Sequence, residues 1–267
     1  MTKRRGKALG ALLSLAMLVG LVCGLSVTAA AADEPFDLRG VEVDSDDYAN
    51  YSSATTGTVC GKTVTFAGWY DNAQYTGTPV SSTSGAGPYY ARWTLNGTTV
   101  VTSTVMIDSA GEISLSCIEE TGINWDSETS TLTLENAAIL VPDGAGGIDA
   151  NEDLNIVLEG SSTVIASAGG IWANGNITIS GGAVLTATGE QGYGILTAGS
   201  VAIRGEGTVV TAAGGSSYID DEDGTEYGAG IVAVGDILVE DGAEVTATGD
   251  GYGMGALSGS ITISGGA

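Results

Sequence analysis

The heptapeptide ITISGGA at residues 177–183 occurs a second time, unchanged, at residues 261–267. Its opening triplet belongs to a set of six related triplets in the C-terminal half of the chain: Leu132-Thr133-Leu134, Ile156-Val157-Leu158, Ile177-Thr178-Ile179, Val201-Ala202-Ile203, Ile237-Leu238-Val239 and Ile261-Thr262-Ile263. Their starts are separated by 24, 21, 24, 36 and 24 residues. The longest separation contains a twelve-residue insertion, residues 216–227, so the underlying repeat is close to constant.

A second signature, Gly followed by Ile or Met, keeps step with the triplets and occurs at Gly147-Ile148, Gly170-Ile171, Gly194-Ile195, Gly230-Ile231 and Gly253-Met254. A third strand-like piece, such as Val184-Leu185-Thr186, lies between the two signatures. Three short strands in a period of about 24 residues, with small residues at the turns, are typical of a parallel β-helix. We therefore predict an all-β chain in which residues 112–267 form a right-handed parallel β-helix of about five to six coils.

Side chains in a strand point alternately to opposite faces, which divides the triplets into inward and outward positions. The two inward columns are wholly aliphatic: Leu132, Ile156, Ile177, Val201, Ile237 and Ile261 form one, and Leu134, Leu158, Ile179, Ile203, Val239 and Ile263 form the other. The outward column is mixed in character. Stacked coils would share one aliphatic interior, which a β-sandwich, the alternative all-β fold, does not explain.

The chain of 267 residues has 32 acidic and 8 basic residues, no His, and a net charge of −24. Such a charge excludes a nucleic-acid-binding protein, which needs clustered Lys and Arg to neutralise phosphates. The lack of His excludes serine triads with a His base and His-ligated zinc sites.

Residues 1–32 have the three parts of a secretory signal peptide. Lys3 to Lys7 are mostly basic, Ala8 to Val27 are almost wholly apolar, and Ala30-Ala31-Ala32 forms a small-residue cleavage site. We expect a secreted or cell-surface protein with no integral membrane span after signal removal; a retained anchor is the alternative. Cys60 and Cys117 then remain, either as a disulfide or as two free thiols.

Residues 33–56 are acidic and are predicted to form a loose leader, and residues 57–111 are predicted to form a small β module with a hairpin turn at Asn96-Gly97. The stretches FAGWYD (66–71) and YYARW (89–93) make residues 57–94 resemble the internalin-type B repeat of bacterial surface proteins. That resemblance implies a β-grasp-like unit. Trp69 and Trp93 are either ligand platforms or the core of this unit.

The stretch NWDSETSTLTL (124–134) precedes recurring Ile-Thr-Ile-Ser-Gly-Gly and Gly-Ile-x-Ala units. With these motifs, residues 121–267 resemble a bacterial family of secreted carbohydrate-binding β-helix domains. The resemblance implies polysaccharide binding, and in some relatives calcium held by acidic side chains between coils.

One aromatic residue is a candidate for contact with a sugar. Trp172 takes the outward position of the strand after a Gly-Ile signature, beside Leu196 and Val232 on the next coils. Its ring can stack on a sugar face. The alternative is a Trp that a loop or another chain covers.

Acidic residues before the Gly-Ile signature are candidates for calcium ligands. Glu190, Glu226 and Asp250 follow one another on successive coils, and the insertion adds Asp220, Asp221 and Asp223. Coils stack about 4.8 Å apart, so like charges there repel, and a bound Ca²⁺ would relieve the repulsion. The alternative is a solvated acidic loop that keeps the protein soluble.

Parallel β-helices include polysaccharide lyases and hydrolases, but Arg204 is the only basic residue after residue 112, and no Asp or Glu occupies a strand centre. We therefore assign no catalytic residue and expect a polysaccharide-binding protein that is not an enzyme. A surface adhesin or stalk is the alternative, and a lyase or hydrolase is the third possibility. The final repeat stops after seven residues, so we expect a longer native protein, or end-to-end self-association of the open coil.

Overall fold

The structure, a computed structural model, describes residues 36–85, 87–115, 120–215 and 228–265. Within these residues the protein is all-β, with one short 3-10 helix, η1 (Tyr48–Asn50). The strands form three sheets, which are named below by their number of described strands. No helix in the described part of the chain has the length and apolar character needed to cross a lipid bilayer.

The described strands are distributed over the three sheets as follows. The ten-stranded sheet contains β1 (Phe36–Asp37), β2 (Thr56–Val59), β3 (Lys62–Tyr70), β4 (Tyr89–Leu95), β5 (Thr98–Val101), β9 (Ala138–Val141), β12 (Ser161–Ala166), β15 (Val184–Gly189), β18 (Val209–Gly214) and β21 (Glu244–Gly249). The six-stranded sheet contains β6 (Val105–Ile107), β10 (Ile148–Ala150), β13 (Ile171–Ala173), β16 (Tyr193–Thr197), β19 (Ala229–Ala233) and β22 (Tyr252–Ala256). The seven-stranded sheet contains β7 (Ile123–Asp126), β8 (Thr131–Glu135), β11 (Leu154–Glu159), β14 (Ile177–Ser180), β17 (Val201–Arg204), β20 (Ile237–Glu240) and β23 (Ile261–Ile263).

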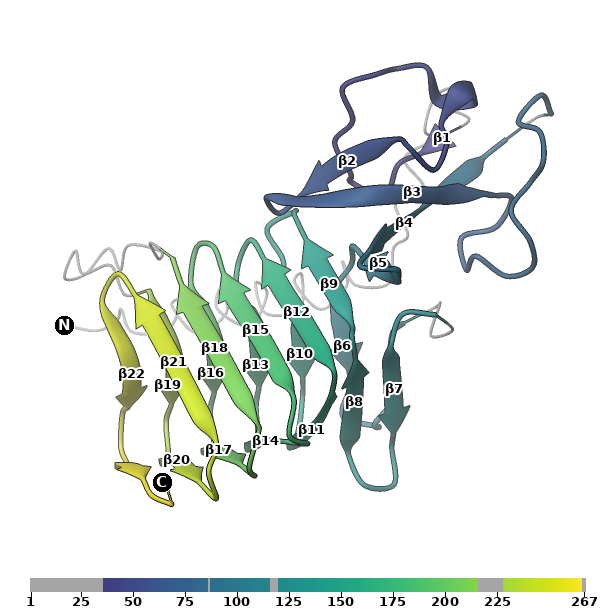
Figure 1. The fold of residues 1–267 in the computed structure, drawn as a ribbon. Coiled ribbons are helices and arrows are strands. Elements are labelled where there is room, and N and C mark those ends of the chain that lie inside the picture. Colours follow the sequence, from purple (N-terminus) through teal and green to yellow (C-terminus); the bar gives the residue numbers. More distant parts are fainter. Residues whose placement is uncertain (1–35, 86, 116–119, 216–227, 266–267) are drawn as a thin grey trace, which may run out of the picture. The chain divides into compact units, whose positions relative to one another are not determined.

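From β8 onward the chain visits the seven-, ten- and six-stranded sheets in a fixed order, once per repeat. Each strand pairs in parallel with the corresponding strand of the next repeat, as in β12 with β15 and β13 with β16. Figure 1 shows β9, β12, β15, β18 and β21 side by side in this order. The predicted all-β architecture with parallel sheets is confirmed.

The aliphatic triplets line a common interior, as their alternation predicts. In β14, Ile177 and Ile179 are fully buried, whereas Thr178 between them is only partly buried. The same alternation occurs in β17 and β20. Most of these inward residues belong to one hydrophobic cluster, which extends from Val101 to Ile237. Ile261 and Ile263, which were also predicted to point inward, are 44% and 67% exposed in the last described triplet.

The predicted alignment of two triplets is wrong by two residues. The sequence aligns Ile156 with Ile177, but the structure pairs Ile156 with Ile179, and it pairs Leu154 with Ile177. β11 has three inward aliphatic residues and β14 has two, so the sequence alone allows two alignments of these strands. A shift of two residues keeps every side chain on its own face of the sheet, so the inward and outward assignment survives the correction.

A ladder of polar side chains fixes this register at the turn before the seven-stranded sheet. Asp153, Asn176, Ser200, Asp236 and Ser260 occupy the same place in successive repeats. Each side-chain oxygen of the first four accepts a hydrogen bond from the backbone N–H of the next residue in the ladder, at 2.7–3.0 Å. Glycine precedes the ladder residue in later repeats because a Cβ on Gly199 would lie only 2.7 Å from the Asn176 amide oxygen.

The small β module has a core of aromatic residues. Trp93 and Trp69 are 2% and 5% exposed, and their indole N–H groups donate to backbone carbonyls of Leu38 and Tyr48. Both Trp residues are therefore core residues and not ligand platforms. The described part of the segment that the sequence assigns to a loose leader, residues 36–56, packs against this core through Phe36, Val41, Tyr48 and Tyr51.

Parallel strand pairing begins before residue 112, which the sequence predicts as the first residue of the repeats. The hairpin turn at Asn96-Gly97 is confirmed between β4 and β5. β5 then pairs in parallel with β9, and β6 pairs in parallel with β10. Leu140 and Ile165, which point outward from β9 and β12, belong to the aromatic core of the module. The module thus covers the outer face of the first two repeats of the ten-stranded sheet.

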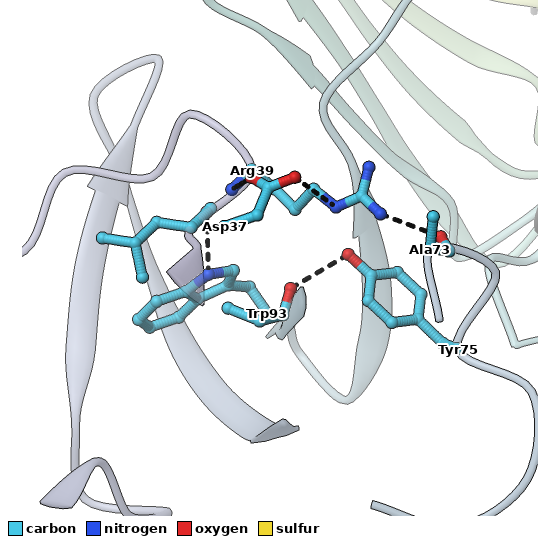
Figure 2. A network of polar contacts seen from close by, with 7 residues as sticks. Asp37, Arg39, Ala73, Tyr75 and Trp93 are labelled. Carbon is cyan, nitrogen blue, oxygen red and sulfur yellow. Dashed lines mark hydrogen bonds and ion pairs between the residues drawn. The ribbon is translucent and has the colours of Figure 1, made fainter. Parts of the chain in front are cut away.

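Arg39, one of the four basic residues after residue 32, is held inside the module (Figure 2). Its guanidinium carbon lies 4.6 Å from the centroid of the Tyr90 ring. Its terminal nitrogen donates to the Ala73 carbonyl at 3.0 Å, and its Nε lies 3.6 Å from a carboxylate oxygen of Asp37. These contacts neutralise Arg39 within the fold.

Arg92, on β4, is held in a similar way. It donates hydrogen bonds to the hydroxyls of Thr99 and Tyr70, at 2.9 and 3.2 Å, and forms an ion pair with Glu120. Its side chain is only 15% exposed. The two arginines of the module are therefore engaged by other residues of the chain.

Candidate functional site

The structure places Trp172 on the outer face of the six-stranded sheet, as the alternation predicts. In β13, Ile171 and Ala173 are buried in the interior, and the Trp172 side chain between them is 39% exposed. Its strand neighbours are Asp149 on β10 and Leu196 on β16. An exposed indole on a rigid strand offers a large flat apolar surface to a ligand.

The residues in register with Trp172 form a strip across the six-stranded sheet, here called the Trp172 strip. The strip consists of Met106, Asp149, Trp172, Leu196 and Val232, one on each strand from β6 to β19. Met106 is 41% exposed, and Val232 is buried although it points outward. Four of the five side chains are apolar, so the strip combines an apolar platform with a single carboxylate.

Asp149 is the polar member of the Trp172 strip, and it lies at the centre of β10, so the prediction that no Asp or Glu occupies a strand centre is wrong. Its carboxylate lies in register between Met106 and Trp172, and burial there raises its pKa above the ordinary value of 3.8. A partly desolvated carboxylate is a strong hydrogen-bond acceptor. The sequence does contain the information needed to pair Asp149 with Trp172, because each residue follows a Gly-Ile signature, Gly147-Ile148 and Gly170-Ile171, by one position.

Two of the candidate calcium ligands, Glu190 and Asp250, lie within the described residues. Glu190 and Asp250 are both exposed and directly follow β15 and β21. The strands in register end at Gly189, Gly214 and Gly249, so Gly215 takes the place between the two acidic residues. Glu190 and Asp250 are therefore two strands apart, and Glu226, which the sequence places between them, lies outside the described residues.

The other candidate calcium ligands, Asp220, Asp221, Asp223 and Glu226, lie outside the described residues. In the described ranges, no group of three or more His, Cys, Asp or Glu side chains is arranged to hold a metal ion. The insertion could complete such a group with Glu190 or Asp250, so calcium binding stays a prediction.

A shallow groove of about 420 Å³ lies where β7 and β8 meet β11. Three acidic residues line it: Glu120, Glu135 and Glu159. Glu135 and Glu159 are register neighbours, and Glu120 is paired with Arg92. All three are exposed, whereas the acid of a glycosidase needs an apolar pocket that favours its protonated form. The groove therefore has the character of a solvated acidic rim.

Cys60 carries a free thiol at the turn between β2 and β3. Burial, followed by the negative charges of Glu190 and Asp143, raises the pKa of this thiol to about 11. The thiol is consequently protonated at neutral pH and is a poor nucleophile. Cys117, its possible disulfide partner, lies outside the described residues.

Comparison with known proteins gives no relative from which a site could be transferred. No family model matches the chain, and neither a curated protein nor a solved structure matches it significantly.

Proposed function

We propose that this protein is a secreted or cell-surface carbohydrate-binding protein without catalytic activity, and that the Trp172 strip is its polysaccharide-binding surface. The fold proposed for it is a right-handed parallel β-helix of about five to six coils. The observation that carries the proposal is the pairing of an exposed Trp172 with the half-buried carboxylate of Asp149 on adjacent strands.

A sugar presents an apolar C–H face and a rim of hydroxyl groups, and the strip offers a counterpart for each. The indole of Trp172, extended by Met106 and Leu196, is an apolar platform for the face. Asp149 accepts hydrogen bonds from hydroxyls at the edge, and such bonds to a charged acceptor are stronger than neutral ones. The strand backbone holds these groups in place, so binding orders few side chains.

The charges of the chain favour an uncharged glycan over an acidic one. Four basic residues remain after residue 32, and Arg39 and Arg92 are engaged within the module. Lys62 lies on β3, and Arg204 lies on the seven-stranded sheet in register with Glu240. None of the four belongs to the Trp172 strip, where Asp149 would repel a uronate or sulfate.

Calcium is proposed as a structural ion and not as part of the sugar site. Glu190, Asp250 and the acidic residues of the insertion would supply carboxylate ligands, which Ca²⁺ prefers. Calcium that binds only the folded protein would raise its melting temperature by mass action. A calorimetric titration that shows no heat of binding at millimolar Ca²⁺ would leave the solvated acidic loop as the explanation.

The second candidate function is a surface adhesin or stalk in which the stacked repeats serve as a rigid spacer. Two observations favour it: the continuous polar ladder from Asp153 to Ser260, and the fusion of the module to the first repeats. End-to-end self-association would use exposed apolar side chains of the last described repeat, such as Leu257, Ile261 and Ile263. A lyase or hydrolase has no comparable support.

The test is a glycan array probed with the secreted protein and two variants. Trp172→Ala should remove retention on the glycans that the wild type binds, and Asp149→Asn should weaken it, with little change in melting temperature. Leu238→Ala, an outward apolar residue on the seven-stranded sheet, is the matched control and should bind normally. Binding to host proteins with no glycan retained would favour the adhesin instead.

A further inference from the structure

Threonine residues repeat on the outer face of the ten-stranded sheet. Three strands end in closely similar sequences: Thr186-Ala187-Thr188-Gly189, Thr211-Ala212-Ala213-Gly214 and Thr246-Ala247-Thr248-Gly249. Parallel pairing aligns Thr186, Thr211 and Thr246 in one column. Ala187 and Ala212 are fully buried, so the threonines on either side of them point outward. Hydroxyl and methyl groups therefore repeat at the strand spacing of about 4.8 Å.

This column continues into a hollow beside the small β module. Thr163 on β12 is the register neighbour of Thr186. It also lines a hollow of about 160 Å³ together with Leu95, Asn96, Thr98, Asn136, Ala137, Ala138 and Ser161. No charged side chain lines this hollow. The threonine track, defined as Thr163, Thr186, Thr188, Thr211, Thr246 and Thr248, thus leads from a concave polar end onto a flat face.

The same face changes character where the module ends. Leu140 and Ile165 occupy one outward column on β9 and β12, and the module covers them. In that column the next strands carry Thr188, Ala213 and Thr248. The change from aliphatic to small or hydroxyl-bearing side chains coincides with the end of the module. Thr246 and Thr248 are exposed, and the other residues of the track are partly exposed.

The absence of charge from the track distinguishes it from an ordinary exposed strand face. Thr favours strands, which explains threonine here but not the lack of charged residues in a chain of net charge −24. Glu244 is the first residue of β21, and Glu190 and Asp250 directly follow β15 and β21. A neutral surface bordered by carboxylates selects an uncharged partner over an anionic one.

We propose that the threonine track and its hollow bind an uncharged glycan chain that lies across the strands, with one terminal sugar in the hollow. Threonine hydroxyls donate and accept hydrogen bonds, and their methyl groups contact the C–H faces of the sugars. Threonine is stiff at χ1, so little side-chain entropy is lost on binding. The hollow favours a flexible chain over a flat crystalline surface, which could not enter it. This surface is separate from the Trp172 strip, which lies on another sheet.

The test is affinity electrophoresis of the secreted protein in native gels that contain dextran, laminarin or mannan. Thr211→Glu places a carboxylate in the middle of the track, which would have to be desolvated beside a neutral sugar. We expect its dissociation constant to rise at least about tenfold for the polymer that retards the wild type. Thr178→Glu makes the same change on the outer face of the seven-stranded sheet, and the polymer should retard it as strongly as it retards the wild type, relative to a gel without polymer. Both variants should melt at similar temperatures.

Several outcomes would overturn the inference. Retardation of Thr211→Glu equal to that of the wild type would do so, as would retardation by polygalacturonate alone. Inhibition of ice recrystallisation that Thr211→Glu abolishes, without retardation by any glycan, would assign the track to ice. If Trp172→Ala is no longer retarded and Thr211→Glu is retarded as the wild type is, the Trp172 strip binds the glycan and the threonine track does not. The reverse pattern would support the track and remove the Trp172 strip.

Discussion

Replacing Ile179 by Ala should destabilise the stacked repeats strongly. Ile179 is fully buried, and its register neighbours Ile156 and Ile203 are fully buried as well. Replacing a buried Ile by Ala costs about 2–5 kcal/mol, and the cost is highest where the neighbours cannot close the cavity. The two neighbouring strands are held by backbone pairing, so we expect a value near the top of that range, about 4 kcal/mol. Thr178→Ala, one residue away and facing outward, should cost about 0.5 kcal/mol or less.

Thermal unfolding followed by far-UV circular dichroism measures the difference between the two variants. For a domain of this size, 1 kcal/mol shifts the melting temperature by about 2–4 °C, so Ile179→Ala should melt about 10 °C below the wild type. Equal shifts for Ile179→Ala and Thr178→Ala would refute the inward and outward assignment. A double-mutant cycle tests the register, because Ile156 and Ile179 should couple by about 0.5 kcal/mol or more, whereas the diagonal pair Leu158 and Ile179 should couple more weakly.

Three further predictions concern the ladder, the module and the thiol. Hydrogen bonds from the backbone and side chain of Ser260 lower the pKa of Asp236 below 3.8. The Asp236 carboxylate therefore stabilises β23 fully above pH 3.8, and this stabilisation is lost as the pH falls through the pKa of Asp236 in the folded protein. Amide exchange in β23 should accelerate over that pH range, and Asp236→Asn should remove this pH dependence. Ile165→Asp buries an unpaired charge under the module. In circular dichroism it should abolish the near-UV signal of the aromatic core while the far-UV signal of the repeats remains. Loss of both signals together would contradict this prediction. In a Cys117→Ser background, alkylation of Cys60 at pH 8 should be more than about 100-fold slower than in urea-unfolded protein, because its pKa is about 11.

The all-β architecture with parallel sheets was predictable because it rests on a periodicity that the chain repeats many times. The Ile-x-Ile triplets and the Gly-Ile signature fixed which side chains point inward, and the structure agrees in β14, β17 and β20. The frame of β11 was not predictable from these signatures, because Leu154, Ile156 and Leu158 fit either of two alignments. Asp153 resolves the choice through its hydrogen bond to the Asn176 backbone, a contact between residues of different repeats.

The join between the module and the repeats could not be read from the sequence. Leu140 and Ile165 look like ordinary members of aliphatic strands, and only the structure shows that they face outward into an aromatic core. The segment around Phe36 and Tyr51 is acidic on average, and this composition hides the few aromatic residues that fold it onto Trp69.

The candidate site was predictable in part for a related reason. Trp172 stands out as a rare residue type, and alternation alone indicates that it points outward. Its partner Asp149 is one acidic residue among 32, so only register identifies it. The threonine track likewise becomes visible only when β15, β18 and β21 are aligned. The expected column of Glu190, Glu226 and Asp250 stays a prediction, because Glu226 lies outside the described residues.

The central claim is that the Trp172 strip binds polysaccharide, and the indole N–H signals of the protein test it most directly. The chain has 4 Trp residues, and the indole N–H groups of Trp69, Trp93 and Trp125 donate to backbone carbonyls within the fold. In a ¹⁵N-resolved NMR titration with a glycan that the array retains, the signal of Trp172 should shift in a saturable way while the other three stay in place. A retained glycan that leaves the Trp172 signal unmoved would contradict the account.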